Sequence, residues 1–182
     1  AHRSAVPERA AKAPSVACMP GAGARECWSG RRSSNVRRPS ASACCARGRR
    51  GAHFTFDVSD VAAIDGMMAA VERDFDGLDV LVNNAGIAVI APIEQETLEG
   101  WRRTQAVNME GVFLGTREAI RAMKGGSGSI VNISSIEGII GDPMVPAYNA
   151  SKGGVRLLTK SVALYCAQQG YRIRVNSVHP GY

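Results

Sequence analysis

The sequence predicts an α/β fold with a doubly wound, mostly parallel sheet, and three observations support that prediction. Segments of strand type and segments of helical periodicity alternate from residue 52 to the end of the chain. Parallel strands need a long crossover, and a helix-like segment separates each strand-like run from the next. Polar or turn residues also fall at the carboxyl ends of the strand-like runs, at the sheet edge where open α/β sheets bind ligands: Asp57, Asn84, Ser135 and Pro180.

The first predicted unit covers residues 54–77. Phe54–Val58 has the aromatic and β-branched residues of a short strand. Ser59 then predicts a helix N-cap, and apolar residues recur in steps of three and four from Val61 to Phe75. Gly77 predicts the end of that helix.

The next predicted unit runs from a buried strand to a pair of helices. Leu78–Val82 is a continuous apolar run interrupted only by Asp79, which is typical of a buried strand. Thr97 predicts the cap of a helix that reaches Val107. A second, separate helix is expected from about 111 to 123, since Lys124-Gly125-Gly126 follows it.

The last predicted unit holds a strand, a long helix and a final strand. Ser129–Ile133 predicts the strand, and a loop rich in Gly and Pro leads to a helix from about 148 to 168. Gly170 closes the helix, and Ile173–Val178 predicts the strand after it. Each predicted strand is therefore joined to the next through helical segments.

Residues 1–51 differ in composition from residues 52–182. Residues 1–50 hold 11 Lys or Arg against 2 Asp or Glu, and no Leu, Ile, Phe or Tyr. Such a segment cannot bury enough apolar area to offset its ordering entropy, so we expect residues 1–51 to be disordered or poorly packed. Cys44-Cys45 with His53 has no spacing that we take as a metal site, and we expect no metal. No apolar run of 18 residues occurs, so we expect a cytoplasmic protein without a membrane span.

A tyrosine and a lysine are spaced for acid–base chemistry. Tyr148 and Lys152 are four residues apart, so on a helix they share a face, one turn apart. A lysine ammonium favours the phenolate form of a neighbouring tyrosine, which allows the tyrosine to act as a general acid/base. Ser135, at the end of a strand, is placed to hold a substrate oxygen beside them. Taken alone, the pair favours the simpler interpretation of a packing tyrosine and a solvated helix lysine.

Several motifs in order resemble the short-chain dehydrogenase/reductase family, and most closely its bacterial hydroxysteroid and cyclic-alcohol dehydrogenases. Asn83-Asn84-Ala85-Gly86 resembles the family's turn after the fourth strand. Asp57-Val58 resembles the pair that contacts adenine, and Pro180-Gly181 resembles the turn beside the nicotinamide. The family's catalytic positions match Asn108, Ser135, Tyr148 and Lys152.

The resemblance implies an NAD(P)-dependent oxidoreductase that interconverts a secondary alcohol and a ketone. Tyr148 would exchange the proton as hydride moves to or from the nicotinamide, and Ser135 would bind the substrate oxygen. Lys152 would support Tyr148 and bond the nicotinamide ribose, and Asn108 would hold a water of the proton relay. The substrate is a small-molecule alcohol or ketone. NAD is favoured as the cofactor, and NADP is not excluded.

The implied cofactor-binding residues are Asp57, Val58, Asn84, Ala85, Gly86, Tyr148, Lys152, Pro180 and Gly181. The resemblance further implies a homotetramer packed through the helices at about 111–123 and 148–168. We assign no chemistry to His179, and we expect Asn83 to tie strands together rather than to contact the substrate.

Two parts of the family pattern have no counterpart in this sequence. The family's first strand leads into a turn of the form Thr-Gly-x-x-x-Gly-x-Gly, which holds the pyrophosphate. Gly21-Ala22-Gly23 is the nearest match, and we expect no apolar strand before it. The family also continues past the position of Tyr182. We therefore expect a Rossmann-like domain over 52–182 that is truncated at both ends and lacks its first βαβ unit and its C-terminal strand. We also expect this chain to bind cofactor poorly and to be inactive.

Three explanations of the basic segment remain open: an organellar transit peptide, an arm that binds nucleic acid, and out-of-frame translation. The first two would add residues before a Gly-rich turn rather than replace it. A reading frame shifted by two bases across Ala10 to Pro20 permits a Gly-rich sequence, so we favour out-of-frame translation of residues 1 to about 51. The alternative function is a non-catalytic dehydrogenase scaffold whose basic arm binds nucleic acid or a protein partner, although we do not expect nucleic acid binding.

Overall fold

The computed structural model describes residues 16–19, 52 and 54–181. Strands and helices alternate along these residues. The elements in chain order are β1 (Val16–Met19), α1 (Val61–Phe75), β2 (Val80–Asn83), α2 (Leu98–Gln105), a π-helical turn (Ala106–Glu110), α3 (Gly111–Met123), β3 (Ser127–Ile133), a 3-10 turn (Ile136–Gly138), α4 (Pro146–Gln168) and β4 (Arg172–Val178).

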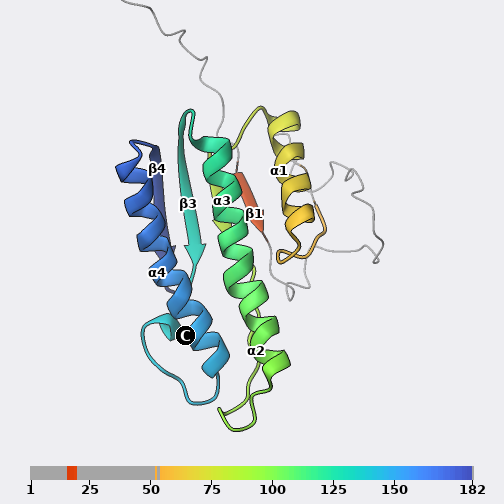
Figure 1. The fold of residues 1–182 in the computed structure, drawn as a ribbon, viewed down its shortest axis with the longest axis vertical. Helices are drawn as coiled ribbons and strands as arrows, with labels where there is room; N and C mark the ends of the chain where they lie inside the picture. Colours follow the sequence, from red (N-terminus) through yellow and green to blue (C-terminus); the bar gives the residue numbers. More distant parts are fainter. Residues whose placement is uncertain (1–15, 20–51, 53, 182) are drawn as a thin grey trace, which may run out of the picture.

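The four strands form one parallel sheet in the order β1-β2-β3-β4 (Figure 1). Asn83 at the end of β2 lies opposite Asn132 of β3, and Ile133 at the end of β3 lies opposite Val178 of β4. The loops that follow these three strands therefore leave the sheet at one edge. The predicted α/β fold with a parallel sheet is confirmed.

Helices α3 and α4 pack on one face of the sheet, and α1 packs against α3 (Figure 1). Leu81, Ile130 and Val175 point to that face and are buried, whereas on the opposite face Val131 is half-buried and Arg174 is exposed. In the part of the chain that the structure describes, helices thus cover a single face, although the alternating pattern predicted helices on both.

The hydrophobic core lies between α1, α3, α4 and this covered face of the sheet. Its most deeply buried side chains are Ile64, Leu81, Ala119, Met123, Ile130 and Cys166. Cys166 is fully buried, and burial raises the pKa of its thiol. Below the covered face, the Asn83 side chain donates to Asn132 Oδ1 on β3 (2.8 Å) and to Thr116 Oγ1 on α3 (3.1 Å), so Asn83 does tie elements together.

The prediction of a strand at Phe54–Val58 is wrong. Its residue types favour a strand, but backbone groups stay in a strand only where a neighbour completes their hydrogen bonds. None of the described strands pairs with this segment. The cap of α1 also differs from the prediction, because Asp60 rather than Ser59 accepts the N–H groups of the first turn, at 3.0 and 3.2 Å. The Ser59 hydroxyl instead donates to Asp57 Oδ1 (2.7 Å).

The two helices predicted before and after residue 108 form one continuous rod (Figure 1). Thr97 caps α2 as predicted, with its Oγ1 accepting from Gly100 N (2.9 Å). Instead of a break, the π-helical turn Ala106–Glu110 joins α2 to α3. Such turns insert one extra residue into a helix and often occur at functional sites.

The structure also corrects the prediction for the basic segment at one place. Val16–Met19 form β1 and pair along their whole length with Val80–Asn83, so a strand does precede Gly21-Ala22-Gly23. Parallel pairing uses backbone groups and does not require Leu, Ile, Phe or Tyr. The other residues of the 1–51 segment lie outside the described residues.

Candidate active site

An open cleft of about 370 Å³ lies at the carboxyl edge of the sheet. Its walls come from the loops after β2, β3 and β4 and from the first two turns of α4. The lining residues are Asn84, Gly86, Ile87, Ala88, Ile133, Ser134, Ser135, Tyr148, Lys152, Pro180 and Gly181. The structure thus brings most of the predicted site residues together in one cleft.

Lys152 is buried at the base of this cleft and is held by β3. Its Nζ donates to Ile133 O (2.8 Å) and lies 5.5 Å from the centre of the Tyr148 ring. The side chain is 3% exposed, and burial lowers the pKa of Lys152 to about 8. A cation therefore stands beside the Tyr148 ring, on the face of α4 that the four-residue spacing predicted.

The lowered pKa of Lys152 predicts a pH-dependent contribution to stability. Because the folded-state pKa is about 8 and the ordinary value is 10.5, the unfolded chain binds the extra proton between those values. The free energy of unfolding should therefore rise by about 3 kcal/mol as the pH increases through that window. Below the window, the full cost of burying the charged Lys152 side chain destabilises the folded state. Urea denaturation of the wild type and of Lys152→Met across the window measures this contribution as the difference between them. A difference that does not change with pH contradicts it.

Ser135 caps the 3-10 turn at the end of β3. Its Oγ accepts from Glu137 N (3.1 Å), and the residue is buried. Because this oxygen already accepts a bond, its hydroxyl hydrogen is left to donate toward an oxygen in the cleft. The segment is fixed against the end of β4, since Ser134 N donates to Val178 O and Ile136 N donates to Pro180 O, both at 2.8 Å.

His179 also holds Ser135, although the sequence analysis assigned it no chemistry. Its Nδ1 lies 3.1 Å from Ser135 O, and its Nε2 lies 2.9 Å from Ser177 Oγ. A carbonyl oxygen only accepts, so this partner assigns the hydrogen to Nδ1. In the parallel register of β3 and β4, Ile133 pairs with Val178, which brings His179 beside Ser134, the residue before Ser135; the sequence alone did not give this register.

Asn108 lies behind the cleft, in the π-helical turn, and is fully buried. Its Oδ1 accepts from Ile87 N (2.8 Å), and its Nδ2 donates to Ile87 O and Ser151 Oγ, both at 2.9 Å. Both amide hydrogens are used by protein groups. A water of a proton relay would therefore bond the second lone pair of Oδ1 or the backbone carbonyl of Asn108.

Three predicted cofactor-binding residues lie outside the cleft. Val58 and Ala85 line a narrow neighbouring crevice, together with Asn83, Val107, Gly111 and Val112. Asp57 is exposed, and its Oδ1 accepts from Ser59 N (2.9 Å) and Ser59 Oγ (2.7 Å). These hydrogen bonds hold the pKa of Asp57 below its usual value. Asp57 thus serves as the turn residue that its type commonly provides.

The cleft fits the nicotinamide half of a dinucleotide. A Cβ on Gly86 would lie 3.4 Å from Lys152 Nζ and 3.5 Å from Asn108 Oδ1, so a side chain at this position would pack directly against the Lys152 ammonium. Asn83 Oδ1, beside the crevice, is buried and has no hydrogen-bond partner among the described residues. The residues at the carboxyl end of β1, where a pyrophosphate would bind, lie outside the described ones.

Neither a metal centre nor a membrane helix occurs in the described ranges. No three His, Cys, Asp or Glu side chains in residues 16–19, 52 and 54–181 are grouped to hold a metal ion. Cys44, Cys45 and His53 fall outside those ranges. No helix in the same ranges is long and apolar enough to cross a membrane.

Comparison with known proteins identifies the family. The family model described as short chain dehydrogenase matches residues 19–182. With its parallel α/β sheet and the cleft that joins Ser135, Tyr148 and Lys152, the chain belongs to the short-chain dehydrogenase family.

Individual relatives agree with this assignment. The chain is 52% identical over 128 residues to an NADP-dependent (R)-specific alcohol dehydrogenase of Lentilactobacillus kefiri, which covers 69% of this chain and 51% of that protein. It is 44% identical over 133 residues to a 3-beta-hydroxysteroid dehydrogenase of Comamonas testosteroni, and the matched residues make up 73% of this chain and 52% of that protein. A crystal structure of a short-chain type dehydrogenase/reductase from Mycobacterium marinum superposes with a TM-score of 0.66 at 38% identity, and the match covers 69% of this chain and 52% of that one. The chain spans about half the length of the curated relatives it matches.

Proposed function

We propose that this protein is an NAD(P)-dependent oxidoreductase that interconverts a secondary alcohol and a ketone. The observation that carries the proposal is the convergence of Ser135, Tyr148 and Lys152 on one cleft beside Gly86 and Pro180. Relatives named as alcohol, cyclopentanol and hydroxysteroid dehydrogenases support the same reaction class. When bound, the cofactor supplies or accepts the hydride.

The residues of this chain handle the proton and the substrate oxygen. Ser135 donates its hydroxyl hydrogen to that oxygen. Tyr148 takes a proton from the alcohol during oxidation and returns it to the carbonyl oxygen during reduction. Lys152 favours the phenolate form of Tyr148 and offers donors to the ribose hydroxyls of the cofactor. Asn108 holds the loop at Ile87 against α4 and carries the water of the proton relay.

The assay for this proposal follows the absorbance of the reduced nicotinamide. The purified chain is mixed with cyclopentanol or a hydroxysteroid and either NAD⁺ or NADP⁺. The protein assayed is a version of the chain that carries a family-type Gly-rich turn. The expected result is alcohol-dependent formation of the reduced cofactor. Absence of turnover in such a chain with every alcohol tested contradicts the proposal.

The 182-residue chain itself should bind the cofactor weakly. Residues 20–51 do not contain the spacing of the Gly-rich turn that cradles the pyrophosphate. Calorimetric titration with NAD⁺ should detect no tight binding, whereas a chain in which residues 1–51 are replaced by a family-type strand and Gly-rich turn should bind. Tight binding to the 182-residue chain contradicts this prediction.

Out-of-frame translation of residues 1 to about 51 remains our explanation for this segment. Resequencing the gene and detecting the segment's peptides by mass spectrometry test it, because an intact frame with matching peptides excludes the shift.

The alternative, a scaffold whose basic arm binds nucleic acid, predicts salt-sensitive DNA binding that is lost on deleting residues 1–50. The cytoplasmic location also stays a prediction.

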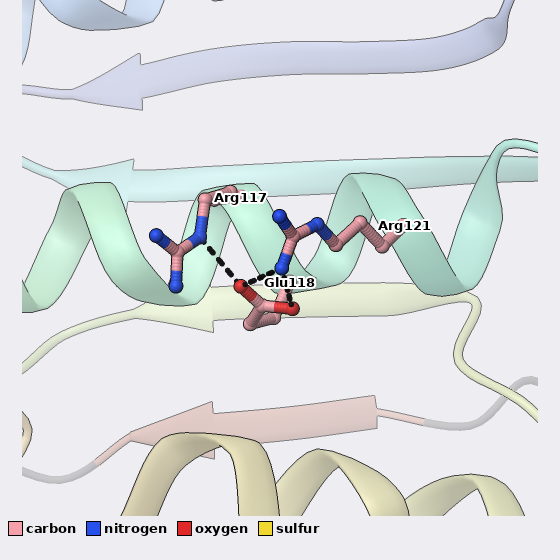
Figure 2. Close-up of polar contacts among 3 residues, drawn as sticks. All are labelled: Arg117, Glu118 and Arg121. Carbon is pink, nitrogen blue, oxygen red and sulfur yellow. Dashed lines mark hydrogen bonds and ion pairs between the residues drawn. The ribbon is translucent and has the colours of Figure 1, made fainter. Parts of the chain in front are cut away.

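Assembly of the protein as a homotetramer through α3 and α4 is part of the proposal. Phe113 on α3 is 47% exposed, and Leu157 and Leu164 on α4 are 68% and 65% exposed, although all three are large and apolar. The Arg117 guanidinium lies 5.5 Å from the Phe113 ring centre. Glu118 bonds the guanidinium groups of both Arg117 and Arg121 (Figure 2), which partly neutralises their charge and lowers the cost of covering this part of α3.

Replacing Leu157 and Leu164 together with Glu should reduce the mass of the particle in solution. Two carboxylates at the centre of an apolar interface would be desolvated without partners. Light scattering measures the mass, and Val61→Glu at an exposed apolar position of α1 is the matched control. An unchanged mass in the double variant contradicts assembly through α4.

A further inference from the structure

The Asn149 side chain ties the segment after Ser135 to the first turn of α4. Its Nδ2 donates to Glu137 O (2.7 Å), to Glu137 Oε2 (2.7 Å) and to Ile140 O (3.2 Å). Its Oδ1 accepts from Asp142 N (3.1 Å). One amide thus holds three residues of a segment that has no regular structure beyond its single 3-10 turn.

Glu137, which accepts two hydrogen bonds from Asn149, also donates a hydrogen bond to Ser135. Glu137 is 6% exposed, and Asn149 contacts both its carbonyl and its carboxylate. The N–H of the same Glu137 donates to Ser135 Oγ (3.1 Å). An unbroken path of hydrogen bonds therefore runs from Asn149 through Glu137 to the oxygen of Ser135.

This path matters because Ser135 and Tyr148 stand on different elements. Tyr148 belongs to α4, whereas Ser135 follows β3, and both have to reach the same substrate oxygen. Asn149 is the next residue after Tyr148 on α4 and bonds the segment that begins at Ser135. Since a misplacement of about 1 Å can cost about 100-fold in rate, a link between these two elements has catalytic value.

Resting on the proposed function, we infer that Asn149 is a positioning residue that sets Ser135 Oγ relative to the Tyr148 hydroxyl. The chemistry demands an amide at this position. Nδ2 faces one carboxylate and two carbonyl oxygens, all of which only accept, while Oδ1 faces an N–H. An aspartate at position 149 would have no hydrogen to donate. Its oxygen would therefore face the Glu137 carboxylate and the two carbonyl oxygens without a hydrogen bond.

Three variants and one control test the inference by kinetics, each made in the chain whose residues 1–51 are replaced by a family-type strand and Gly-rich turn. Asn149→Asp should lower kcat for cyclopentanol about 10- to 100-fold, with the KM for NAD⁺ changed less than about twofold. Asn149→Ser, which removes the contacts without adding charge, should cause a smaller loss. Adding Glu137→Gln to Asn149→Asp should restore part of kcat, because the new amide at 137 can donate to the new carboxylate. Asn176→Asp makes the same chemical change at an exposed position of β4 and should change nothing.

Hydrogen exchange, followed by mass spectrometry on peptides covering 135–142, tests the link without relying on turnover. Exchange should quicken in Asn149→Ser and stay at the wild-type rate in Asn176→Asp. Unchanged exchange in Asn149→Ser, or a wild-type kcat in Asn149→Asp, overturns the inference. If the chain with the Gly-rich turn in place shows no dehydrogenase activity before any substitution at 149, the proposed function is contradicted instead, and exchange then decides alone whether Asn149 holds the segment.

Discussion

Replacing Tyr148 with Phe in the chain whose Gly-rich turn is in place should reduce alcohol oxidation by about 100- to 10,000-fold in kcat, the range that a general acid/base contributes. The substitution removes one oxygen and keeps the ring beside Lys152. Within the described residues the Tyr148 hydroxyl has no hydrogen-bond partner, so no protein contact is lost. The loss should therefore appear in kcat, while the melting temperature and the affinity for the cofactor stay close to those of the parent chain.

Tyr165→Phe is the matched control for this experiment. Tyr165 lies on the same helix, is 48% exposed, and packs its ring edge-on against Tyr171 at 6.2 Å. Removing its hydroxyl should leave the rate of alcohol oxidation unchanged. A Tyr148→Phe variant that keeps more than about a tenth of the parent rate would show that another group transfers the proton.

Replacing Gly138 with Ala should destabilise the protein and damage the site together. A Cβ at this position would lie 2.7 Å from Lys152 O, 2.8 Å from Lys152 C and 2.8 Å from Ser134 Oγ. Two of these atoms belong to the backbone of α4 and cannot swing aside as a flexible side chain can. We expect a loss of about 1–3 kcal/mol in the free energy of unfolding and a melting temperature lower by several degrees.

The same variant should lower kcat, because it pushes the turn after Ser135 away from Lys152. Gly141→Ala is the control, since a Cβ there would meet nothing within 4 Å. Both proteins are compared by thermal unfolding and by alcohol oxidation. Equal melting temperatures for the two variants would contradict the close approach of the turn to α4.

The cleft was the most predictable part of the molecule. Asn84, Ser135 and Pro180 follow strand-like runs, and parallel strands deliver the residues after them to one edge. The spacing of Tyr148 and Lys152 fixed their shared helix face independently of the rest of the fold. These inferences need only the local pattern and the parallel arrangement, and the structure agrees with both.

Other features depend on partners that a local pattern does not reveal. Phe54–Val58 has strand-forming residues but no described neighbour to pair with, whereas Val16–Met19 has a weak pattern and pairs with β2. Ser59 and Asp60 both have capping side chains, and the position of the first helical residue made Asp60 the cap. His179 and Asn149 act on Ser135 from distant places in the sequence, so their roles became visible only when their contacts were known.

The π-helical turn limits how the chain length can vary. Before it, Gln105 Nε2 donates to Ala147 O on α4 (3.0 Å), and after it, Thr116 Oγ1 accepts from Asn83 on β2 (3.1 Å). Each residue advances a helix by about 100°, so deleting one residue between these two anchors would rotate one of them away from its partner. Insertions and deletions among related sequences should therefore avoid the interval from Gln105 to Thr116 and collect in the loops on either side of the rod.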